Sequence, residues 1–189
     1  MPACSDGTLR ANGCNINTNT DATHCGMCSN ACATGKSCVA GSCVTILVNG
    51  DFETGDFTGW TALSNPMEGP GCSGGNHAVP SYSSIAGPQH GSYFAAGSCG
   101  NPPGSGLEQT ISVNPGQLYT VTGYYNAGGL TPSGGALYID GTTIATAAFT
   151  DNGWHGVTGV FTPSTASVTF GFSLYNGPHA SGWDNFSIV

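Results

Sequence analysis

The sequence predicts an all-β protein, in which an antiparallel β-sandwich over residues 45–189 follows a small disulfide-rich domain over residues 1–44. Three observations predict this organisation. After residue 44, short stretches of alternating apolar and polar residues are separated by Gly, Pro and Asn, a pattern typical of sandwiches and barrels. No segment shows helical periodicity. Seven of the nine cysteines precede residue 44, where apolar residues are too few to build a core.

The expected strands alternate between two faces. Tyr119, Val121 and Tyr125 share one face of a strand, and Asp140-Gly141 is a two-residue hairpin signal between two others. The ranges that we expect to be strands are 45–53, 57–63, 91–97, 106–113, 117–126, 135–140, 142–149, 155–162, 166–175 and 182–189.

One long connection, 64–90, shows no strand pattern, and loops of this length in compact domains are usually functional or disordered. Cys72 lies inside it and Cys99 lies just beyond the strand that follows. We expect Cys72 and Cys99 to form a disulfide that stabilises the loop by roughly 3 kcal/mol in the chain-entropy model.

The charge is strongly asymmetric. Charged residues make up only 6% of the chain, the formal net charge is −8, and the only two cations, Arg10 and Lys36, precede residue 44. Nucleic acid and anionic membrane surfaces are therefore excluded as expected partners, because both are bound by Lys and Arg. The sequence contains no apolar run long enough for a transmembrane helix and no signal peptide, and Met1-Pro2-Ala3 is interpreted as an artificial start on a mature chain.

The leader, residues 1–44, is dense in cysteine, which indicates a disulfide scaffold and a secreted, extracellular protein. A zinc site is the alternative, because Cys25-Gly26-Met27-Cys28 is a C-x-x-C motif next to His24. The run Cys25-Gly-x-Cys28-x-x-x-Cys32 and the spacing to Cys38 and Cys43 resemble the stigma-specific-protein-like cysteine-rich repeat. That repeat usually has eight cysteines, so one cysteine is left over here, which is free, pairs with the second domain or links two chains as a disulfide dimer.

An ordered series of motifs follows the leader: Asn49-Gly50-Asp51-Phe52-Glu53 with Gly59-Trp60, then Leu107-Glu108-Gln109-Thr110-Ile111, Pro115-Gly116-Gln117-Leu118-Tyr119 and Trp183-Asp184-Asn185-Phe186. The series resembles the carbohydrate-binding modules of the galactose-binding-like jelly-roll superfamily, over about residues 46–189. The resemblance implies a jelly-roll sandwich that binds a polysaccharide or other glycan without catalysis and holds a structural calcium.

The expected calcium ligands are Glu53 and Asp184, which match the acidic positions near the first and last strands of the family, with Asp51 beside them. If these strands pair, two carboxylates lie close together in a domain without Lys or Arg. A hard cation with oxygen ligands neutralises such a pair, and solvated acids or one shared proton are the alternatives.

Aromatic residues on strand faces opposite the apolar sets are candidates for stacking on sugar rings, with polar neighbours for the hydroxyls. The ligand-binding set that we predict is Tyr124, Tyr138, Trp154, Tyr175, Gln109 and Asn126. The alternative is that the aromatics simply cover the second sheet face. A further set of aromatics is assigned to the core: Trp60, Tyr119, Phe161, Phe170, Phe172 and Phe186.

The sequence predicts no enzyme, because no nucleophile motif is present and the histidines are scattered. Two other functions remain open. One is a structural or adhesive protein of the cell wall. The other is a glycoside hydrolase using a carboxylate pair drawn from Glu53, Glu68, Glu108 and Asp151.

Overall fold

The structure is a computed structural model that describes residues 16–33, 36–63, 77–82, 84–129 and 133–189. Within these ranges the side chains of residues 63, 77, 98–105, 133 and 175–179 are not described. All regular structure in this part of the chain is β-structure, as the sequence predicts. No helix within these ranges is long and apolar enough to span a membrane.

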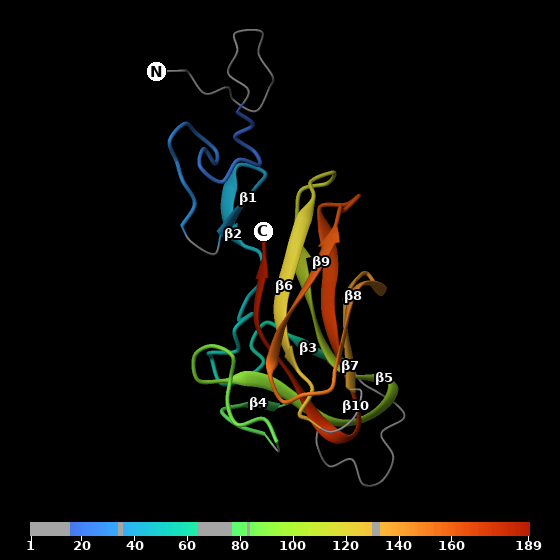
Figure 1. Cartoon of the computed structure of the whole chain (residues 1–189). Coiled ribbons are helices and arrows are strands. Elements are labelled where there is room, and N and C mark those ends of the chain that lie inside the picture. Colours follow the sequence, from blue (N-terminus) through green and yellow to red (C-terminus); the bar gives the residue numbers. More distant parts are fainter. Residues whose placement is uncertain (1–15, 34–35, 64–76, 83, 130–132) are drawn as a thin grey trace.

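Two strands form a hairpin in the leader, β1 (Lys36–Val39) and β2 (Ser42–Thr45), and the other strands form the sandwich (Figure 1). In chain order the sandwich strands are β3 (Thr61–Leu63), β4 (His77–Val79), β5 (Phe94–Ser112), β6 (Tyr119–Asn126), β7 (Ser133–Ile139), β8 (Thr142–Phe149), β9 (Trp154–Phe161) and β10 (Ser167–Ile188). The presence of β4 corrects the expectation that 64–90 contains no strand, and residues 64–76 lie outside the described ranges.

The sandwich has two antiparallel layers that share the long strands β5 and β10. Sheet I has the order β4-β5-β10-β6-β9 and uses residues 94–98 of β5 and 180–188 of β10. Sheet II has the order β3-β5-β10-β7-β8 and uses residues 105–112 of β5 and 167–175 of β10. The pairing register of β10 and β5 shifts between Leu174 and Ala180, where both strands leave one layer and enter the other.

The core between the layers is built largely from aromatic rings, and every residue assigned to it from the sequence is buried there. Trp60 packs edge-on against Phe172 with ring centroids 5.3 Å apart, and Phe172 lies 4.9 Å from Phe186. Asn185 has a left-handed backbone (φ 52°) at a bulge in β10, which brings Trp183 and Phe186 to the same core face. The order of aromatic residues in the sequence therefore reflects one shared core.

The segment 46–60 forms neither the strand predicted over 45–53 nor the beginning of the one predicted over 57–63. It is a series of turns, in which Asn49 and Phe52 have positive φ angles of 50° and 57°. Local bonds from Phe52 N–H to the Asn49 carbonyl (3.3 Å) and from Gly55 N–H to the Phe52 carbonyl (2.9 Å) replace a ladder. Phe52 is nevertheless fully buried. The alternation therefore predicted correctly that Phe52 faces the core, but it predicted the wrong backbone conformation. One backbone bond, from Phe186 N–H to the Gly50 carbonyl (2.8 Å), joins this segment to β10.

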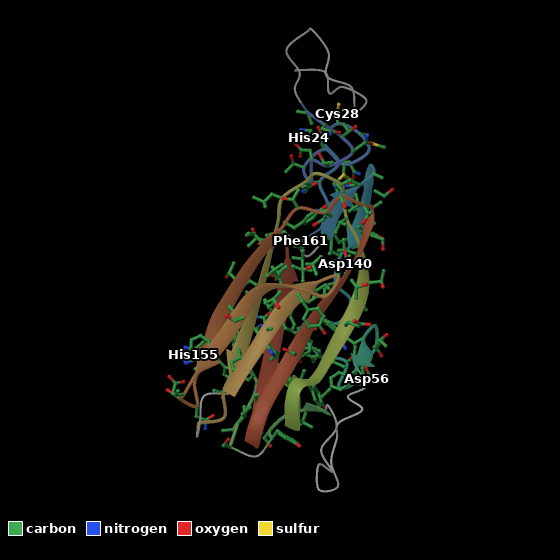
Figure 2. All side chains as sticks on the ribbon, turned by 90° about the vertical axis from the view of Figure 1, so that its right-hand side faces the viewer. His24, Cys28, Asp56, Asp140, His155 and Phe161 are labelled. Carbon is green, nitrogen blue, oxygen red and sulfur yellow. A yellow bond between two sulfur atoms is a disulfide. The ribbon has the colours of Figure 1, made fainter. Side chains whose placement is uncertain are left out.

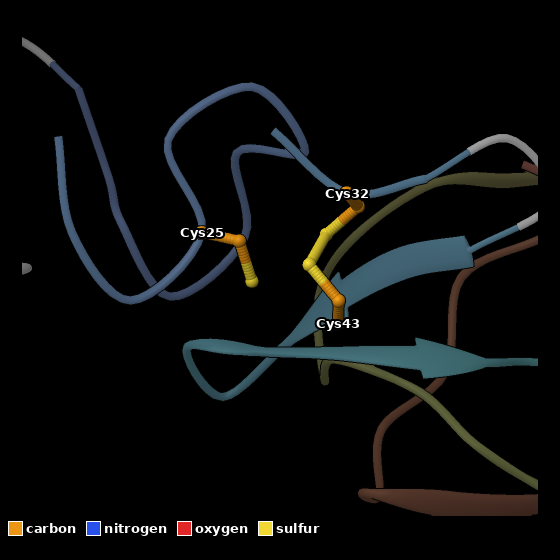
Figure 3. Close-up of side chains that lie close together, drawn as sticks. All are labelled: Cys25, Cys32 and Cys43. Atoms are coloured by element: carbon orange, nitrogen blue, oxygen red, sulfur yellow. A yellow bond between two sulfur atoms is a disulfide. The ribbon is translucent and has the colours of Figure 1, made fainter. Parts of the chain in front are cut away.

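The leader is held by disulfides, which confirms the prediction for its described part. Cys25 bonds Cys38 of β1. Cys32, which precedes β1, bonds Cys43 of β2 (Figure 3). The sulfur atoms of Cys25, Cys32 and Cys43 lie within 4.8 Å of one another because these two disulfides are adjacent. Cys28 is also disulfide-bonded. The zinc alternative is therefore wrong for the C-x-x-C motif, since both of its thiols are oxidised.

Candidate functional site

Part of the outer face of sheet I is covered by the segment 84–93. Ile85 from this segment forms a small buried cluster with Phe94 and Ala96 of β5. Trp154, a predicted sugar-stacking residue, packs edge-on against Phe94 with centroids 5.4 Å apart, and its indole N–H donates to the Gly87 carbonyl (3.1 Å). The structure therefore uses Trp154 to hold this segment down, and not as an open platform.

Asn126 and Tyr124 lie on the same outer face with different environments. Asn126 is only 2% exposed, its amide nitrogen donates to the Asn152 carbonyl (3.3 Å), and its oxygen accepts from Gly128 N–H (2.8 Å). Those bonds fix the turn after β6 and leave Asn126 little capacity for a ligand. Tyr124 is half-buried in a row between Gly156 of β9 and Asp184 of β10.

Gln109, another predicted ligand contact, lies on the core side of sheet II and is 7% exposed. Its side-chain oxygen accepts from Val48 N–H (2.7 Å) and its nitrogen donates to the Val48 carbonyl (3.0 Å). The amide side chain of Gln109 therefore makes the two hydrogen bonds to Val48 that the backbone of a neighbouring strand would make. This pairing satisfies Val48 within the irregular opening segment, where no ladder is available.

The outer face of sheet II carries a row of polar side chains around one tyrosine ring. The strand pairings place Thr61, Glu108, Gly171, Tyr138 and Thr143 in one row that crosses the sheet from β3 to β8. A side chain at position 171 would overlap the Tyr138 ring, so the ring lies over β10 where glycine leaves space. The absence of a Cβ at one position thus sets the orientation of the ring on the next strand.

The surroundings of Tyr138 are polar, small and accessible. Thr61, Thr110 and Thr143 are exposed, and Ala136 and Ser173 in the neighbouring row are half-buried. Burial, together with the nearby Glu108 carboxylate, raises the pKa of Tyr138 well above its ordinary value, so the phenol stays neutral. The side chain of Tyr175, another predicted ligand contact, lies outside the described set.

A second arrangement links the opening segment to β10 through the backbone of residues 89–93. Asp184 is fully buried, and its Oδ2 accepts from Gln89 N–H (2.8 Å) and His90 N–H (3.0 Å). The Oε1 of Glu53 accepts from Ser92 N–H (2.7 Å) and Tyr93 N–H (2.9 Å). Both carboxylates thus hold the same short loop, one on each side of Gly91, where an added Cβ would overlap the Glu53 carboxylate.

Electrostatics at this loop favour an added positive charge. Burial raises the pKa of Asp184 to about 6, three backbone N–H donors partly oppose this rise, and the Glu53 charge adds to it. Neither carboxylate has an ion-pair partner among the described residues, and the chain has only two cations, Arg10 and Lys36. The donor set suits a hard cation with oxygen ligands, because the carboxylates lie within electrostatic reach of each other and lack a counter-ion.

Asp51 stands apart from this pair. Within the described ranges, the only set of three or more potential metal-ligand side chains within 4.8 Å is the disulfide-bonded cysteine group, so Asp51 does not complete a compact cluster with Glu53 and Asp184. Asp51 instead lines a hollow beside the leader. The predicted disulfide between Cys72 and Cys99 lies outside the described residues and side chains.

Of the acids considered for hydrolysis, Asp151 pairs with a histidine. Its Oδ1 lies 2.6 Å from Nε2 of His155, whose ring stacks on Phe149. His155 lies at one side of the sandwich, away from the leader (Figure 2). This bond and the Gly153 N–H lower the pKa of Asp151, which keeps it ionised. Glu68 lies outside the described residues, and Glu108 belongs to the sheet II row.

Comparisons with known proteins agree with this architecture. No family model and no curated protein matches the sequence. The structure aligns with a CBM22-1 xylan-binding domain from Paenibacillus barcinonensis Xyn10C at TM-score 0.55 and 17% identity, covering 73% of this chain and 89% of that one. It also aligns with TmCBM61, solved in complex with β-1,4-galactotriose, at TM-score 0.52 and 19% identity, covering 76% and 97%. The chain has the fold of these carbohydrate-binding modules.

Other structural neighbours widen the comparison. A family 16 carbohydrate-binding module aligns at TM-score 0.52 and 20% identity over 76% of this chain and 99% of that one. The K1 cleaved adhesin domain of Lys-gingipain from Porphyromonas gingivalis W83 aligns at TM-score 0.54 and 13% identity over 74% and 95%. At such identities the likeness concerns the fold, and function must be argued from the site.

Proposed function

We propose that this protein is a secreted glycan-binding protein that holds a polysaccharide, without cleaving it, on the outer face of sheet II. The observation that carries this proposal is the Tyr138 ring, which lies over Gly171 in a row with Glu108 and two exposed threonines. The fold, shared with carbohydrate-binding modules, supports the same class of ligand.

The chemistry of this face suits a sugar chain. The apolar C–H surface of a sugar ring stacks on an aromatic plane, and its hydroxyls donate to Glu108 and exchange hydrogen bonds with Thr61 and Thr143. The small side chain of Ala136, beside the Tyr138 row, allows a chain to approach the sheet closely. Because a neutral glycan carries no charge, binding should depend little on salt.

The outer face of sheet I is the weaker candidate. Its predicted contacts Trp154 and Asn126 are engaged with the protein backbone, and the segment 84–93 packs on part of it. Tyr124 is the one predicted aromatic on that face without such an engagement, so it provides the natural comparison with Tyr138. The proposal therefore narrows the sequence-based ligand set to Tyr138, because the side chain of Tyr175 lies outside the described set.

We further propose that Glu53 and Asp184 hold a structural calcium. Calcium accepts carboxylate and backbone carbonyl oxygens in flexible geometry and would offset the repulsion between the two acids. Its contribution would be to fix the loop 89–93 between the opening segment and β10. The ion takes no part in a reaction in this proposal.

The proposed function is tested by presenting the purified protein to an array of neutral plant and bacterial polysaccharides, in calcium, at low and at high salt. The proposal predicts binding to at least one neutral polysaccharide that persists at 1 M salt, about the concentration that shortens the screening length to ~3 Å. A blank array at high protein concentration contradicts it. Binding that disappears at high salt would indicate charge-driven adsorption instead.

An adhesive role in the cell wall is a second candidate, favoured by the structural likeness to the gingipain adhesin domain. An adhesive protein linked through its odd cysteine would run as a dimer on a non-reducing gel and as a monomer after reduction. A hydrolase would instead release soluble sugars from a bound polysaccharide and lose that activity on Glu108→Gln replacement. Binding without release of sugars supports the proposed function over both.

A further inference from the structure

A hollow of about 290 Å³ lies where the leader meets the closing end of β10. Figure 1 shows this end of β10 beside β1 and β2. One wall comes from β1 and the other from the opening segment and β10. We call it the junction groove, and its lining residues are Lys36, Ser37, Ile46, Leu47, Asn49, Gly50, Asp51 and 185–189. It shares no residue with the Tyr138 row.

The two walls of the junction groove are held at a fixed separation by hydrogen bonds. The side-chain nitrogen of Asn114, in the turn between β5 and β6, donates to the Cys38 carbonyl (2.8 Å), and its oxygen accepts from Ala40 N–H (3.3 Å). Asn114 is 8% exposed, so this paired contact is shielded from water. The bond from Phe186 N–H to the Gly50 carbonyl fixes the second wall to β10. The groove is thus a built feature of the docked leader.

The polar groups in the junction groove have spare hydrogen-bonding capacity. Lys36 is the only cation in the described part of the chain and has no ion pair there. Asp51 accepts one long bond, from Glu53 N–H (3.4 Å). The hydroxyls of Ser37 and Ser187 stand nearby, and the buried Ile46 supplies apolar surface. Donors, acceptors and a small apolar surface together are the features of small-ligand sites.

We propose that the junction groove binds a single neutral sugar unit, as a second glycan site that needs both the leader and the sandwich. The volume lies just below the roughly 300–1,000 Å³ typical of ligand pockets, which suits one sugar ring. Lys36 donates to sugar oxygens and Asp51 accepts from sugar hydroxyls, and their charges cancel. An anionic sugar is disfavoured because the chain carries a net charge of −8. The junction groove would bind the same class of ligand as the outer face of sheet II, but through different residues.

The test is a nuclear magnetic resonance titration of the full chain with free glucose, galactose and xylose, and with glucuronate as the anionic probe. We expect the backbone amides of Lys36, Ser37 and Asp51 to shift with at least one neutral sugar and to shift less with glucuronate. Asp51→Asn and Lys36→Met should each weaken this binding about tenfold or more. Asp151→Asn, which removes an exposed acid outside the groove, is the matched control and should leave binding unchanged.

Two outcomes would overturn the inference. One is that no groove amide shifts with any neutral sugar at 50 mM, about the level that fills most sites with a millimolar dissociation constant. The other is that the shifts survive both groove variants, whose folding is checked by unchanged melting temperatures. A Tyr138→Ala variant separates the two proposals: it should abolish binding to polysaccharide yet leave the groove shifts intact. Loss of the groove shifts with Tyr138→Ala would assign them to sheet II and refute a second site.

Discussion

Replacing Asp184 by Asn should change how stability depends on pH. Asp184 is buried, and burial raises its pKa to about 6 from the ordinary aspartate value of 3.8. A carboxyl whose folded pKa exceeds its unfolded pKa holds a proton in the folded chain that the unfolded chain releases. The free energy of unfolding therefore falls as the pH rises from about 4 to about 6, and it stays low above that range. The Asn variant lacks this titration.

The size of the effect follows from the shift. A difference of roughly two pKa units corresponds to about 3 kcal/mol, at about 1.36 kcal/mol per unit. The stability of the wild type minus that of Asp184→Asn should thus decline by about 3 kcal/mol between pH 4 and pH 7 without metal. Any change in hydrogen bonding to Gln89 or Asn185 adds an offset that does not vary with pH. Asp151→Asn gives a control of opposite sign, because the pKa of Asp151 is lowered.

Calcium should reverse this trend at neutral pH. An ion held by Glu53 and ionised Asp184 stabilises the folded chain by about 2.7 kcal/mol at a free concentration one hundred times its dissociation constant. The assay is urea denaturation followed by tryptophan fluorescence, at pH 4 and pH 7, with calcium or with a chelator. Magnesium should substitute poorly, since it demands a tighter octahedral shell. If the difference in the free energy of unfolding between wild type and Asp184→Asn does not change with pH, the pKa of Asp184 is not raised by burial. Equal stability at pH 7 with and without calcium refutes the metal site.

Three further predictions concern the leader, the opening segment and the sheet II face. Asn114→Ala should leave the sandwich melting temperature nearly unchanged but speed proteolytic cleavage between leader and sandwich; equal cleavage rates would show that the paired contact does not hold the leader. Gln109→Ala should lower the free energy of unfolding by about 1–3 kcal/mol, because the backbone N–H and carbonyl of Val48 lose their partners in a shielded site. The measurement is urea denaturation, and an unchanged midpoint would show that water replaces the lost bonds. Gly171→Ala should displace the Tyr138 ring and weaken polysaccharide binding several-fold while the near-native circular dichroism spectrum persists; unchanged affinity would separate the ring from the ligand.

The sandwich and its core could be predicted from the sequence, because alternation over strands such as 117–126 reports which residues face inward. Tyr119, Phe170 and Phe186 are buried as expected. The error at 45–53 has a physical cause: Asn49 and Phe52 adopt left-handed conformations, and side-chain bonds from Gln109 replace a strand partner. Such long-range pairing by a side chain leaves no local pattern in the sequence.

The candidate site was predicted only in part. Alternation placed Tyr138 on an outer face, but it could not show that Gly171 lies across from it, because that depends on the register between β7 and β10. Trp154 and Asn126 follow the same pattern and are occupied by contacts with the loops. Glu53 and Asp184 were grouped from the acidic positions of the family and from the assumed pairing of the first and last strands. That both bind the backbone of residues 89–93 depends on long-range packing, which leaves no pattern in the sequence.

The central claim is that a glycan lies on sheet II against Tyr138, and its most direct test is calorimetric titration of three proteins with the best polysaccharide from the array. Tyr138→Ala should lose binding by tenfold or more, about 1.4 kcal/mol or more. Tyr124→Ala, a matched change on the opposite sheet, should bind as tightly as the wild type. If Tyr138→Ala retains full affinity while Tyr124→Ala loses it, the ligand lies on sheet I and the assignment of the binding face is wrong.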